Sequence, residues 1–375
     1  MKQRVIIVGG GVIGTMHAWR CIERGLEVVH LERDPMPTMA SVRNFGLVWV
    51  GGRRAGHELE VALQARQLWA DLAQANQKLS FRANGSLTIA RTSEELKVLE
   101  QSMDLPDADA RGWELLSASQ ARKLNPALDG EFRAALHCRL DAAVEPGSVL
   151  TSIRDYLSLT DAYTWMPSTD VLEVKETAEG VSAVASDEAI IHGDFAIVCP
   201  GADHTGLFAG EFEAAPLRRV RLQMFSTMPL GVDLTTSIAD GDSLRYYPAY
   251  EVPALAELPP QHPVAEAAKM QLLMVQRTDG SLTIGDTHEY DEPFDFALRE
   301  PEYDYLIQVA EGILGRRLPK VARRWSGVYS QRTDGAVCER QFVGKRIALV
   351  TGPGGRGNSL APAIAENTLD DWGIL

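Results

Sequence analysis

The first 32 residues combine a glycine turn with two short apolar runs, and this pattern constrains the fold of the chain most strongly. The segment 4–8 is apolar and predicts a buried strand, and the turn Gly-Gly-Gly-Val-Ile-Gly at 9–14 follows at once. A helical stretch at 15–24 and a second apolar run at 27–31 come next, and the run ends at Glu32. Strand, GxGxxG, helix, strand and acid in this order predict a Rossmann-like dinucleotide-binding unit.

Each part of this motif has a physical role. Gly9 permits a tight turn, Gly11 lets the backbone approach a pyrophosphate, and Gly14 lets the helix and the strand pack closely. The helix N-terminus offers free N–H groups and a positive dipole end to phosphates. Glu32 can accept hydrogen bonds from an adenosine ribose. The motif alone leaves NAD and FAD both open.

The C-terminus repeats the order of strand, glycine-rich loop and helix, and this second unit favours FAD over NAD. An apolar run at 346–351 predicts a strand, a glycine-rich loop occupies 352–358, and 359–369 is helical in pattern. A second helix N-terminus can therefore face a ligand that carries negative charge. A reduced flavin ring carries such charge near N1 and the C2 carbonyl, whereas a nicotinamide domain needs no such return of the chain.

Length and charge limit the classes of function. The 375 residues exceed a typical single domain, and 45% hydrophobic with 23% charged residues is typical of a soluble globular protein. The net charge of -14 argues against nucleic-acid binding. The early apolar run is too short for a signal peptide or a membrane span, and four scattered cysteines indicate no disulfide framework and no metal site. We expect a cytoplasmic monomer or homodimer without a membrane partner.

The pattern of predicted secondary structure changes twice in the middle of the chain. Near Phe81 a strand pattern at 86–90 and capping boxes at Thr92 and Ser117 begin an inserted region. Strand patterns at 164–174 and later again indicate an α/β domain. The predicted fold class is α/β with α+β: a Rossmann-like FAD-binding domain with an inserted substrate domain on an antiparallel sheet. The FAD-binding domain is expected at 1–80, 145–220 and 320–375, and the substrate domain at 81–144 and 221–319.

Four segments together resemble the D-amino-acid oxidase superfamily, which has the fold of glycine oxidase and monomeric sarcosine oxidase. They are 9–14 with Glu32, 41–46, 198–202 and 352–362. The resemblance covers nearly the whole chain and implies an FAD-binding domain of the glutathione-reductase type. The FAD-binding residues that it implies are Gly9, Gly11, Val12, Ile13, Gly14, Glu32, Arg33, Ser41, Arg43, Asn44, Phe45, Val171, Gly201, Gly352, Gly354, Gly355, Arg356, Gly357 and Asn358.

Four further segments look like one branch, the FAD-dependent oxidoreductases linked to aminophosphonate breakdown. They are 40–46, 285–290, 325–329 and 351–355. The branch implies a substrate such as 2-aminoethylphosphonate or its N-methyl derivative. The family chemistry is hydride transfer from the carbon beside a neutral amine to the flavin, hydrolysis of the imine to an aldehyde plus amine or ammonia, and reduction of O2 to H2O2.

Departures from the family pattern shape the expected site. Sarcosine oxidases attach flavin to a Cys where this chain has Gly327, and the 41–46 loop holds no His, so non-covalent FAD is expected. Glycine oxidase holds a carboxylate with an Arg where this chain has Tyr329, and sarcosine oxidase has a Lys near Ser359. The pocket for the substrate anion must therefore be built elsewhere.

Six residues are the candidates for the reaction itself. Arg356 can grip a phosphonate or carboxylate with a fork of N–H donors, and Arg43 can serve either an FAD phosphate or the substrate. His288 and Tyr329 are catalytic candidates. Tyr246 and Tyr247 can wall the pocket, although a structural role is open for every one of these residues.

Other functions remain open at this point. The same fold serves D-amino-acid, glycine and sarcosine oxidases or dehydrogenases and 2-hydroxy-acid oxidases. A flavin-binding protein without turnover is an alternative of another class, because fold does not determine function.

Overall fold

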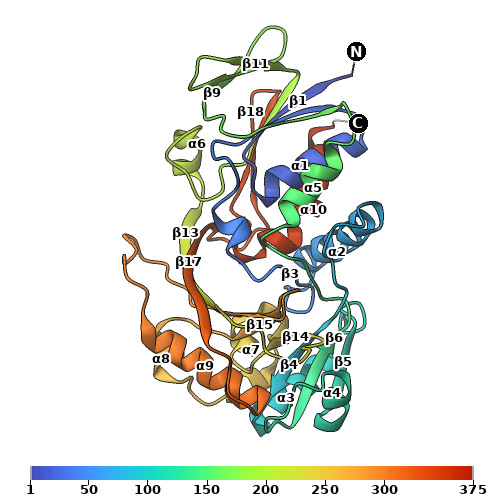
Figure 1. Ribbon diagram of the computed structural model, residues 1–375, viewed down its shortest axis with the longest axis vertical. Coiled ribbons are helices and arrows are strands. Elements are labelled where there is room, and N and C mark those ends of the chain that lie inside the picture. The colour runs from blue at the N-terminus through green and yellow to red at the C-terminus, as the bar shows by residue number, and fades with distance from the viewer. Residues whose placement is uncertain (1, 374–375) are drawn as a thin grey trace.

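The computed structural model describes residues 2–373, and its first layer is a six-stranded sheet. Neighbouring strands are parallel, apart from the antiparallel edge pair β18–β19. The order along the sheet is β18 (Glu339–Val343), β19 (Ile347–Thr351), β12 (Phe195–Val198), β1 (Arg4–Val8), β2 (Glu27–Leu31) and β8 (Tyr163–Met166). The two termini lie at this end of the molecule (Figure 1).

The glycine turn forms because no side chain fits at two of its positions. Gly9 has φ +112°, and a Cβ there would lie 2.3 Å from the carbonyl oxygen of Cys199. A Cβ on Gly14 would lie 1.9 Å from the carbonyl oxygen of Gly9. Glycine therefore lets helix α1 (Val12–Glu23) begin directly behind β1.

Helices pack on one side of this sheet. In Figure 1, α1, α5 (Val149–Leu157) and α10 (Gly357–Trp372) lie together beside the strands, with α2 (His57–Ala75) next to α10. Buried side chains of these helices share one hydrophobic core with β1 and β2. The other face carries a small antiparallel sheet of β9 (Val171–Glu176), β10 (Val181–Ala185) and β11 (Ile190–Gly193).

One predicted strand is wrong in extent. The run 164–174 was expected to be continuous, but it divides into β8 and β9, which belong to different sheets. Pro167 and Ser168 separate them, and Ser168 has φ +55°. Proline lacks an N–H for the ladder, and a left-handed residue turns the chain away from it.

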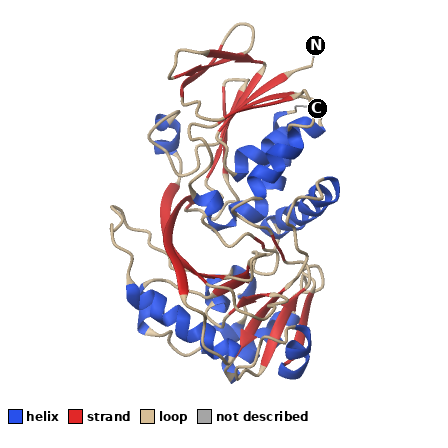
Figure 2. Cartoon of the chain, viewed as in Figure 1, coloured by secondary structure: helices blue, strands red, loops and turns tan. Residues whose placement is uncertain are grey.

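The second large sheet has eight strands and lies in the other half of the molecule (Figure 2). Its neighbours are antiparallel, apart from the parallel pair β14–β4. The order is β17 (Val321–Arg332), β13 (Leu217–Thr227), β16 (Leu282–Gly285), β15 (Leu273–Gln276), β14 (Ser237–Ala239), β4 (Ser86–Ala90), β6 (Ala134–Cys138) and β5 (Trp113–Ser117). The expected combination of a Rossmann-like sheet with an inserted sheet domain is confirmed.

Helices cover the second sheet, and short elements connect the rest. The two expected capping boxes are present at Thr92 and Ser117. The helices of this half are α3 (Ser93–Met103), α4 (Ala118–Leu124), α7 (Ser243–Tyr246), α8 (Pro263–Ala267) and α9 (Glu300–Leu314). The remaining elements are α6 (Ala209–Ala214), the two-stranded sheet of β3 (Leu47–Val48) and β7 (Ala142–Ala143), and the 3-10 turns Ala40–Val42, Pro248–Tyr250, Pro253–Glu257 and Gly354–Arg356.

Two long strands join the halves. β13 and β17 pair from Leu217 with Arg332 to Thr227 with Val321, and they run as one ribbon from the upper to the lower half (Figure 1). The domain boundary expected at 220 falls inside β13, and the one expected at 320 falls just before β17. The domain division itself stays a prediction.

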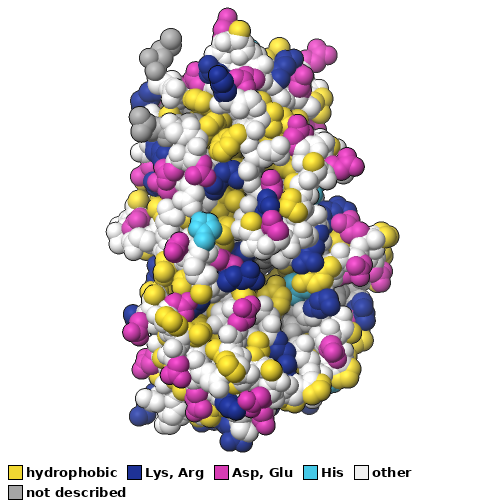
Figure 3. Space-filling model, turned by 180° about the vertical axis from the view of Figure 1, so that it is seen from behind, with side chains coloured by type: hydrophobic (Ala, Val, Ile, Leu, Met, Phe, Trp, Pro, Cys, Tyr) yellow, Lys and Arg dark blue, Asp and Glu magenta, His cyan; other side chains and the backbone are white. Residues whose placement is uncertain are grey.

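The outer surface shown in Figure 3 mixes Lys and Arg with Asp and Glu side chains, without a large patch of one sign. Among residues 2–373, no helix is both long and apolar enough to cross a membrane.

Candidate active site

A cavity of about 510 Å3 runs between the two halves and reaches both glycine-rich loops. Its lining includes residues from β13, β15, β17 and the loop after β16, which belong to the second sheet. The predicted site residues that line it are Gly11, Val12, Ile13, Gly14, Ser41, Arg43, Asn44, Phe45, Gly201, Tyr246, Tyr247, His288, Tyr329, Gly354, Gly355, Arg356, Gly357 and Asn358. The structure thus gathers segments that are more than 300 residues apart in sequence.

The glycine turn is held open by side-chain acceptors. Glu32 Oε2 accepts the backbone N–H of Gly10 at 2.6 Å, and its Oε1 accepts that of Asp34 at 3.0 Å. Ser41 Oγ accepts the backbone N–H of Val12 at 2.9 Å. Ser41 therefore brings the early loop against the start of α1, where a pyrophosphate would bind.

The early loop holds its own shape through Asn44 and Arg43. Asn44 Nδ2 donates to the carbonyls of Ala40 and Ser41 at 3.0 and 2.9 Å, and Asn44 Oδ1 accepts the N–H of Gly46 at 2.6 Å. Arg43 donates to the carbonyls of Thr38 and Ser326, at 2.7 and 3.0 Å. Arg43 thereby joins the loop to β17, and its Nε and Nη1 already donate to the protein.

Five predicted cofactor residues lie outside the lining of the cavity: Gly9, Glu32, Arg33, Val171 and Gly352. Gly9 and Gly352 shape the turns, with φ +112° and +70°. Arg33 is ion-paired with Asp203 at 2.8 Å. Val171 is buried at the start of β9 in an apolar cluster, so its side chain faces the core. Their roles toward a cofactor stay predictions.

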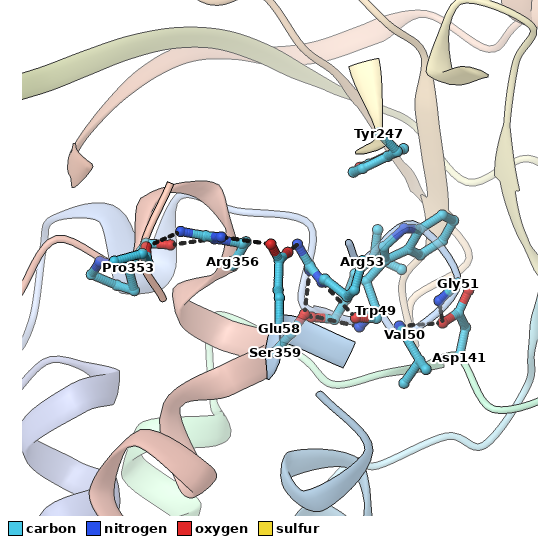
Figure 4. A network of polar contacts seen from close by, with 12 residues as sticks. Trp49, Val50, Gly51, Arg53, Glu58, Asp141, Tyr247, Pro353, Arg356 and Ser359 are labelled. Atoms are coloured by element: carbon cyan, nitrogen blue, oxygen red, sulfur yellow. Dashed lines mark hydrogen bonds and ion pairs between the residues drawn. The ribbon is translucent and has the colours of Figure 1, made fainter. Parts of the chain in front are cut away.

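The C-terminal loop changes the expected role of Arg356. Its Nη1 is 2.9 Å from Glu58 Oε2, and its other donors reach the carbonyls of Ala336 and Pro353. Figure 4 shows that this ion pair continues through Glu58 toward Arg53 and Ser359. Glu58 is only 8% exposed, so its charge needs this partner. Arg356 lines the cavity, but its charge is already balanced by the protein.

Arg53 is the buried end of the same network. Its Nε donates to the Trp49 carbonyl at 2.9 Å, and Nη2 donates to Ser359 Oγ at 3.2 Å. Ser359 Oγ in turn donates to the Leu47 carbonyl at 3.0 Å. Burial lowers the pKa of Arg53, and the neighbouring Glu58 opposes this. The network ties the start of α10 to the Trp49–Arg53 segment.

The residues present fit an FAD molecule. Asn358 Oδ1 and Trp49 Nε1 are buried polar atoms that find no hydrogen-bond partner in the part of the chain that the structure describes, and both residues line the cavity. Asn358 Oδ1 is an acceptor and Trp49 Nε1 is a donor. A flavin ring, which carries both N–H and carbonyl groups, can supply a hydrogen-bond partner to each of them. A Cβ on Gly11 would lie 3.1 Å from Ser41 Oγ, so glycine keeps the turn open for phosphate.

The opposite end of the cavity is built around a pair of hydrogen-bonded side chains. Tyr246 Oη is 2.8 Å from His288 Nε2, and His288 Nδ1 is 2.9 Å from the carbonyl oxygen of Lys269. Because a carbonyl only accepts, His288 Nδ1 carries a hydrogen, and in the neutral imidazole Nε2 is the acceptor for the Tyr246 hydroxyl. Burial and the nearby Tyr329 and Asp286 raise the pKa of Tyr246 well above its usual value.

An acid lies beside this pair. Asp286 is 5% exposed, its Oδ2 is 3.8 Å from His288 Nε2, and its Oδ1 has no hydrogen-bond partner within residues 2–373. Its backbone N–H donates to the Gln271 carbonyl at 3.0 Å. Burial raises the pKa of Asp286, while His288 and the Gln271 side chain lower it.

Tyrosines complete this end of the cavity. Tyr247 packs on Tyr246 with ring centroids 5.1 Å apart, and its hydroxyl accepts from Gln271 Nε2 at 3.2 Å. Tyr329 is buried, and burial together with Asp286 raises its pKa well above the usual value. A Cβ on Gly355 would lie 3.5 Å from Tyr329 Oη, so this tyrosine reaches toward the C-terminal loop. The side chains form a polar, aromatic chamber.

Sequence reasoning missed several lining residues: Arg53, Glu58, Lys269, Gln271 and Asp286. A signal existed for Asp286, which follows a strand pattern two positions before His288. Lys269 and Gln271 lie in a connection without any motif, and only the tertiary fold brings them to the cavity.

Curated proteins named as oxidases match parts of the chain. An opine oxidase subunit from Rhizobium meliloti is 27% identical over 146 residues, which cover 36% of this chain and 39% of that protein. Its counterpart from Agrobacterium tumefaciens is 23% identical, with 59% of this chain and 62% of that protein covered. The chain therefore spans less than two thirds of the curated relatives that it matches.

The fold extends the similarity to whole chains. Glycine oxidase from Bacillus cereus superposes with a TM-score of 0.78 at 18% identity, over 99% of this chain and 95% of that one. The family model of FAD dependent oxidoreductases, DAO, matches residues 4–370. The chain therefore belongs to the DAO family and is an FAD-dependent oxidoreductase.

Proposed function

We propose that this protein oxidises a small anionic amine, and that the substrate is an aminophosphonate such as 2-aminoethylphosphonate or its N-methyl derivative. One observation carries the proposal. Lys269 lines the cavity beside the Tyr246–His288 pair, and among residues 2–373 its side chain has no hydrogen-bond or ion-pair partner. A free cation at this position suits a substrate that carries negative charge.

The other cations of the cavity are largely occupied. Arg43 and Arg53 donate to carbonyl oxygens, and Arg356 is paired with Glu58. Arg332 is ion-paired with Asp334 and Glu339, and Arg245 is close to Asp242 and bonded to the Pro259 carbonyl.

Arg54 is the remaining cation of the lining whose side chain has no polar partner in the described part of the chain, and its guanidinium lies next to Gly335, whereas the backbone carbonyl of Lys269 is bonded to His288. Lys269 is thus the cation that the amine end of the cavity can offer to a substrate.

Bound FAD supplies two-electron oxidation of a C–H bond next to nitrogen. The chain contributes orientation and exclusion of water. Leu222, Met224 and Leu273 form an apolar part of the wall, and the Tyr246 hydroxyl is fixed by His288. Holding the substrate between Lys269 and this wall restricts its motion, which lowers the entropic part of the barrier.

The relatives support the chemical class. Two are named as subunits of opine oxidase and one is named glycine oxidase, and glycine carries an amine and an anion on neighbouring carbons. Oxygen as the electron acceptor and a cytoplasmic location belong to the same proposal. Gly327 offers no thiol, so FAD is held without a covalent bond; acid denaturation should release all yellow colour into the supernatant.

Anaerobic reduction of the bound flavin, followed by absorbance, tests the proposed function. The purified protein is mixed with 2-aminoethylphosphonate, its N-methyl derivative, glycine, sarcosine, D-alanine and 2-hydroxyglutarate. Rapid bleaching by an aminophosphonate, with H2O2 appearing once air returns, is the expected result. Bleaching only by an amino acid or hydroxy acid would replace the substrate class. A flavin that none of these compounds reduces would contradict the proposal.

A further inference from the structure

A buried acid in the amine end of the cavity makes no hydrogen-bonded ion pair with any described residue. Asp286 is 5% exposed and lines the cavity, and its Oδ1 makes no hydrogen bond among the described residues. A carboxylate removed from water is costly unless a cation or hydrogen-bond donors replace its hydration. The protein therefore maintains an unsatisfied acceptor at the wall of its cavity.

No described neighbour forms a hydrogen-bonded ion pair with Asp286. The nearest basic group is His288, whose Nε2 lies 3.8 Å from Asp286 Oδ2 but 2.8 Å from the Tyr246 hydroxyl, so the tyrosine and not the carboxylate is its hydrogen-bond partner. The tyrosines 246, 247, 290 and 329 face the same carboxylate, and its negative charge contributes to raising the pKa of each of them. A cationic or N–H-donating ligand is the missing complement.

The position of the acid is fixed by the backbone. The N–H of Asp286 donates to the Gln271 carbonyl at 3.0 Å, and the N–H of His288 donates to the Ala268 carbonyl at 2.9 Å. These bonds hold the loop after β16 against the segment that also carries Lys269. One wall of the cavity thus carries a carboxylate, Asp286, and a cation, Lys269, on adjoining segments. This pair of charges matches a substrate that has both an amine and an anionic group.

We propose that Asp286 binds the amino group of the substrate and accepts its proton. The substrate arrives as an ammonium ion, one N–H proton moves to the Asp286 carboxylate, and the nitrogen keeps the electron pair of that bond. Charge and atoms balance, because an ammonium and a carboxylate become a neutral amine and a carboxylic acid. The neutral amine is the form from which a hydride can leave the neighbouring carbon. This inference rests on the proposed amine function.

Asp286→Asn tests the amino-group contact by ligand binding. The rapid perturbation of the flavin spectrum that precedes any reduction, followed anaerobically by stopped flow, gives Kd for 2-aminoethylphosphonate and for ethylphosphonate, which has the same anion and no amine. We expect the wild type to bind the amine-bearing ligand at least about tenfold more tightly, and the variant to lose most of this preference, because a hydrogen bond to a charged group is stronger than one to a neutral amide. An unchanged ratio would overturn the proposal.

Stability separates binding from a structural role. Removing an uncompensated buried charge should leave the thermal midpoint of the holoenzyme unchanged or raise it. A variant that loses FAD or unfolds at a clearly lower temperature would show that the carboxylate is structural, which would also overturn the proposal. Asp291→Asn, an exposed acid on the same segment, is the matched control and should change neither Kd nor stability.

The pH profile of flavin reduction provides a further check. In the wild type, the rate constant should fall once Asp286 is protonated. In Asp286→Asn, it should follow the ionisation of the free amine and keep rising toward alkaline pH. If the wild type prefers the amine ligand but no amine reduces its flavin, the proposed oxidation fails while the contact with Asp286 stands. If the wild type is reduced and the variant behaves identically, only the role of Asp286 fails.

Discussion

The two ends of the cavity are built by different means. The nucleotide end is made of glycines and backbone N–H groups, with Glu32 and Ser41 as local acceptors. The amine end is made of side chains from α7, from the loop after β16 and from β17, with Tyr246, His288 and Asp286 at its centre. The first depends on the absence of side chains, and the second depends on their exact packing. Substitutions should therefore fail in different ways at the two ends.

Gly14→Val should have the largest effect. A Cβ at this position would lie 1.9 Å from the Gly9 carbonyl oxygen, and backbone on both sides cannot move away. We expect complete loss of bound FAD, measured as the ratio of flavin to protein absorbance. Gly25→Ala is the control, because a Cβ on Gly25 would meet no atom within 4 Å. We expect only a small loss of stability there, which comes from its φ of +77°. Normal FAD content in Gly14→Val would show that the turn does not depend on glycine.

A buried histidine makes the nucleotide end sensitive to acid. His30 is fully buried, its Nε2 is 2.9 Å from the Gly9 carbonyl oxygen, and its Nδ1 is 3.0 Å from Tyr163 Oη. Burial lowers its pKa to about 3. The unfolded chain therefore binds a proton below about pH 6.5 that the folded chain does not, so His30 lowers the free energy of unfolding as pH falls from 6.5.

The effect is about 1.4 kcal/mol per pH unit for one proton, and it is measured as the difference between the wild type and His30→Gln in urea denaturation at pH 5–6.5. The difference is needed because Asp240, whose pKa burial raises to about 8, changes stability in the opposite sense over this range. A pH-independent difference between the two proteins would show that His30 is protonated in the folded state.

Two cations of the same cavity should behave oppositely when they are substituted. Arg356→Ala leaves Glu58 without its closest partner, so we expect about 1–3 kcal/mol lower stability and little change in the substrate KM. Lys269→Met should raise KM for an anionic amine about tenfold with stability unchanged, and Lys269→Arg should restore most of the loss. The reverse pattern would return the anion site to the C-terminal loop.

The same contrast explains what sequence could predict. The strand–GxGxxG–helix unit, the C-terminal glycine loop and both capping boxes depend on neighbouring residues, so their local spacing predicted the sheet and the FAD site. His288, Tyr246 and Tyr329 were expected at the site, and they line one chamber. Arg356 was a candidate for binding the substrate anion, with a structural role left open, and its pairing with Glu58 depends on a contact between residues 298 positions apart, which no local pattern contains.

The β13–β17 ribbon has a mechanical consequence. Both strands pass from one half of the molecule to the other, and their ladder is continuous apart from one irregularity at Ser226–Thr227. A paired ribbon resists stretching far more than a single connecting chain, because lengthening it requires breaking several hydrogen bonds together. The paired strands should therefore keep the distance between the nucleotide end and the amine end of the cavity nearly constant. Motion that admits substrate should therefore arise in the flanking loops, while the spacing between cofactor and substrate stays constant through the catalytic cycle.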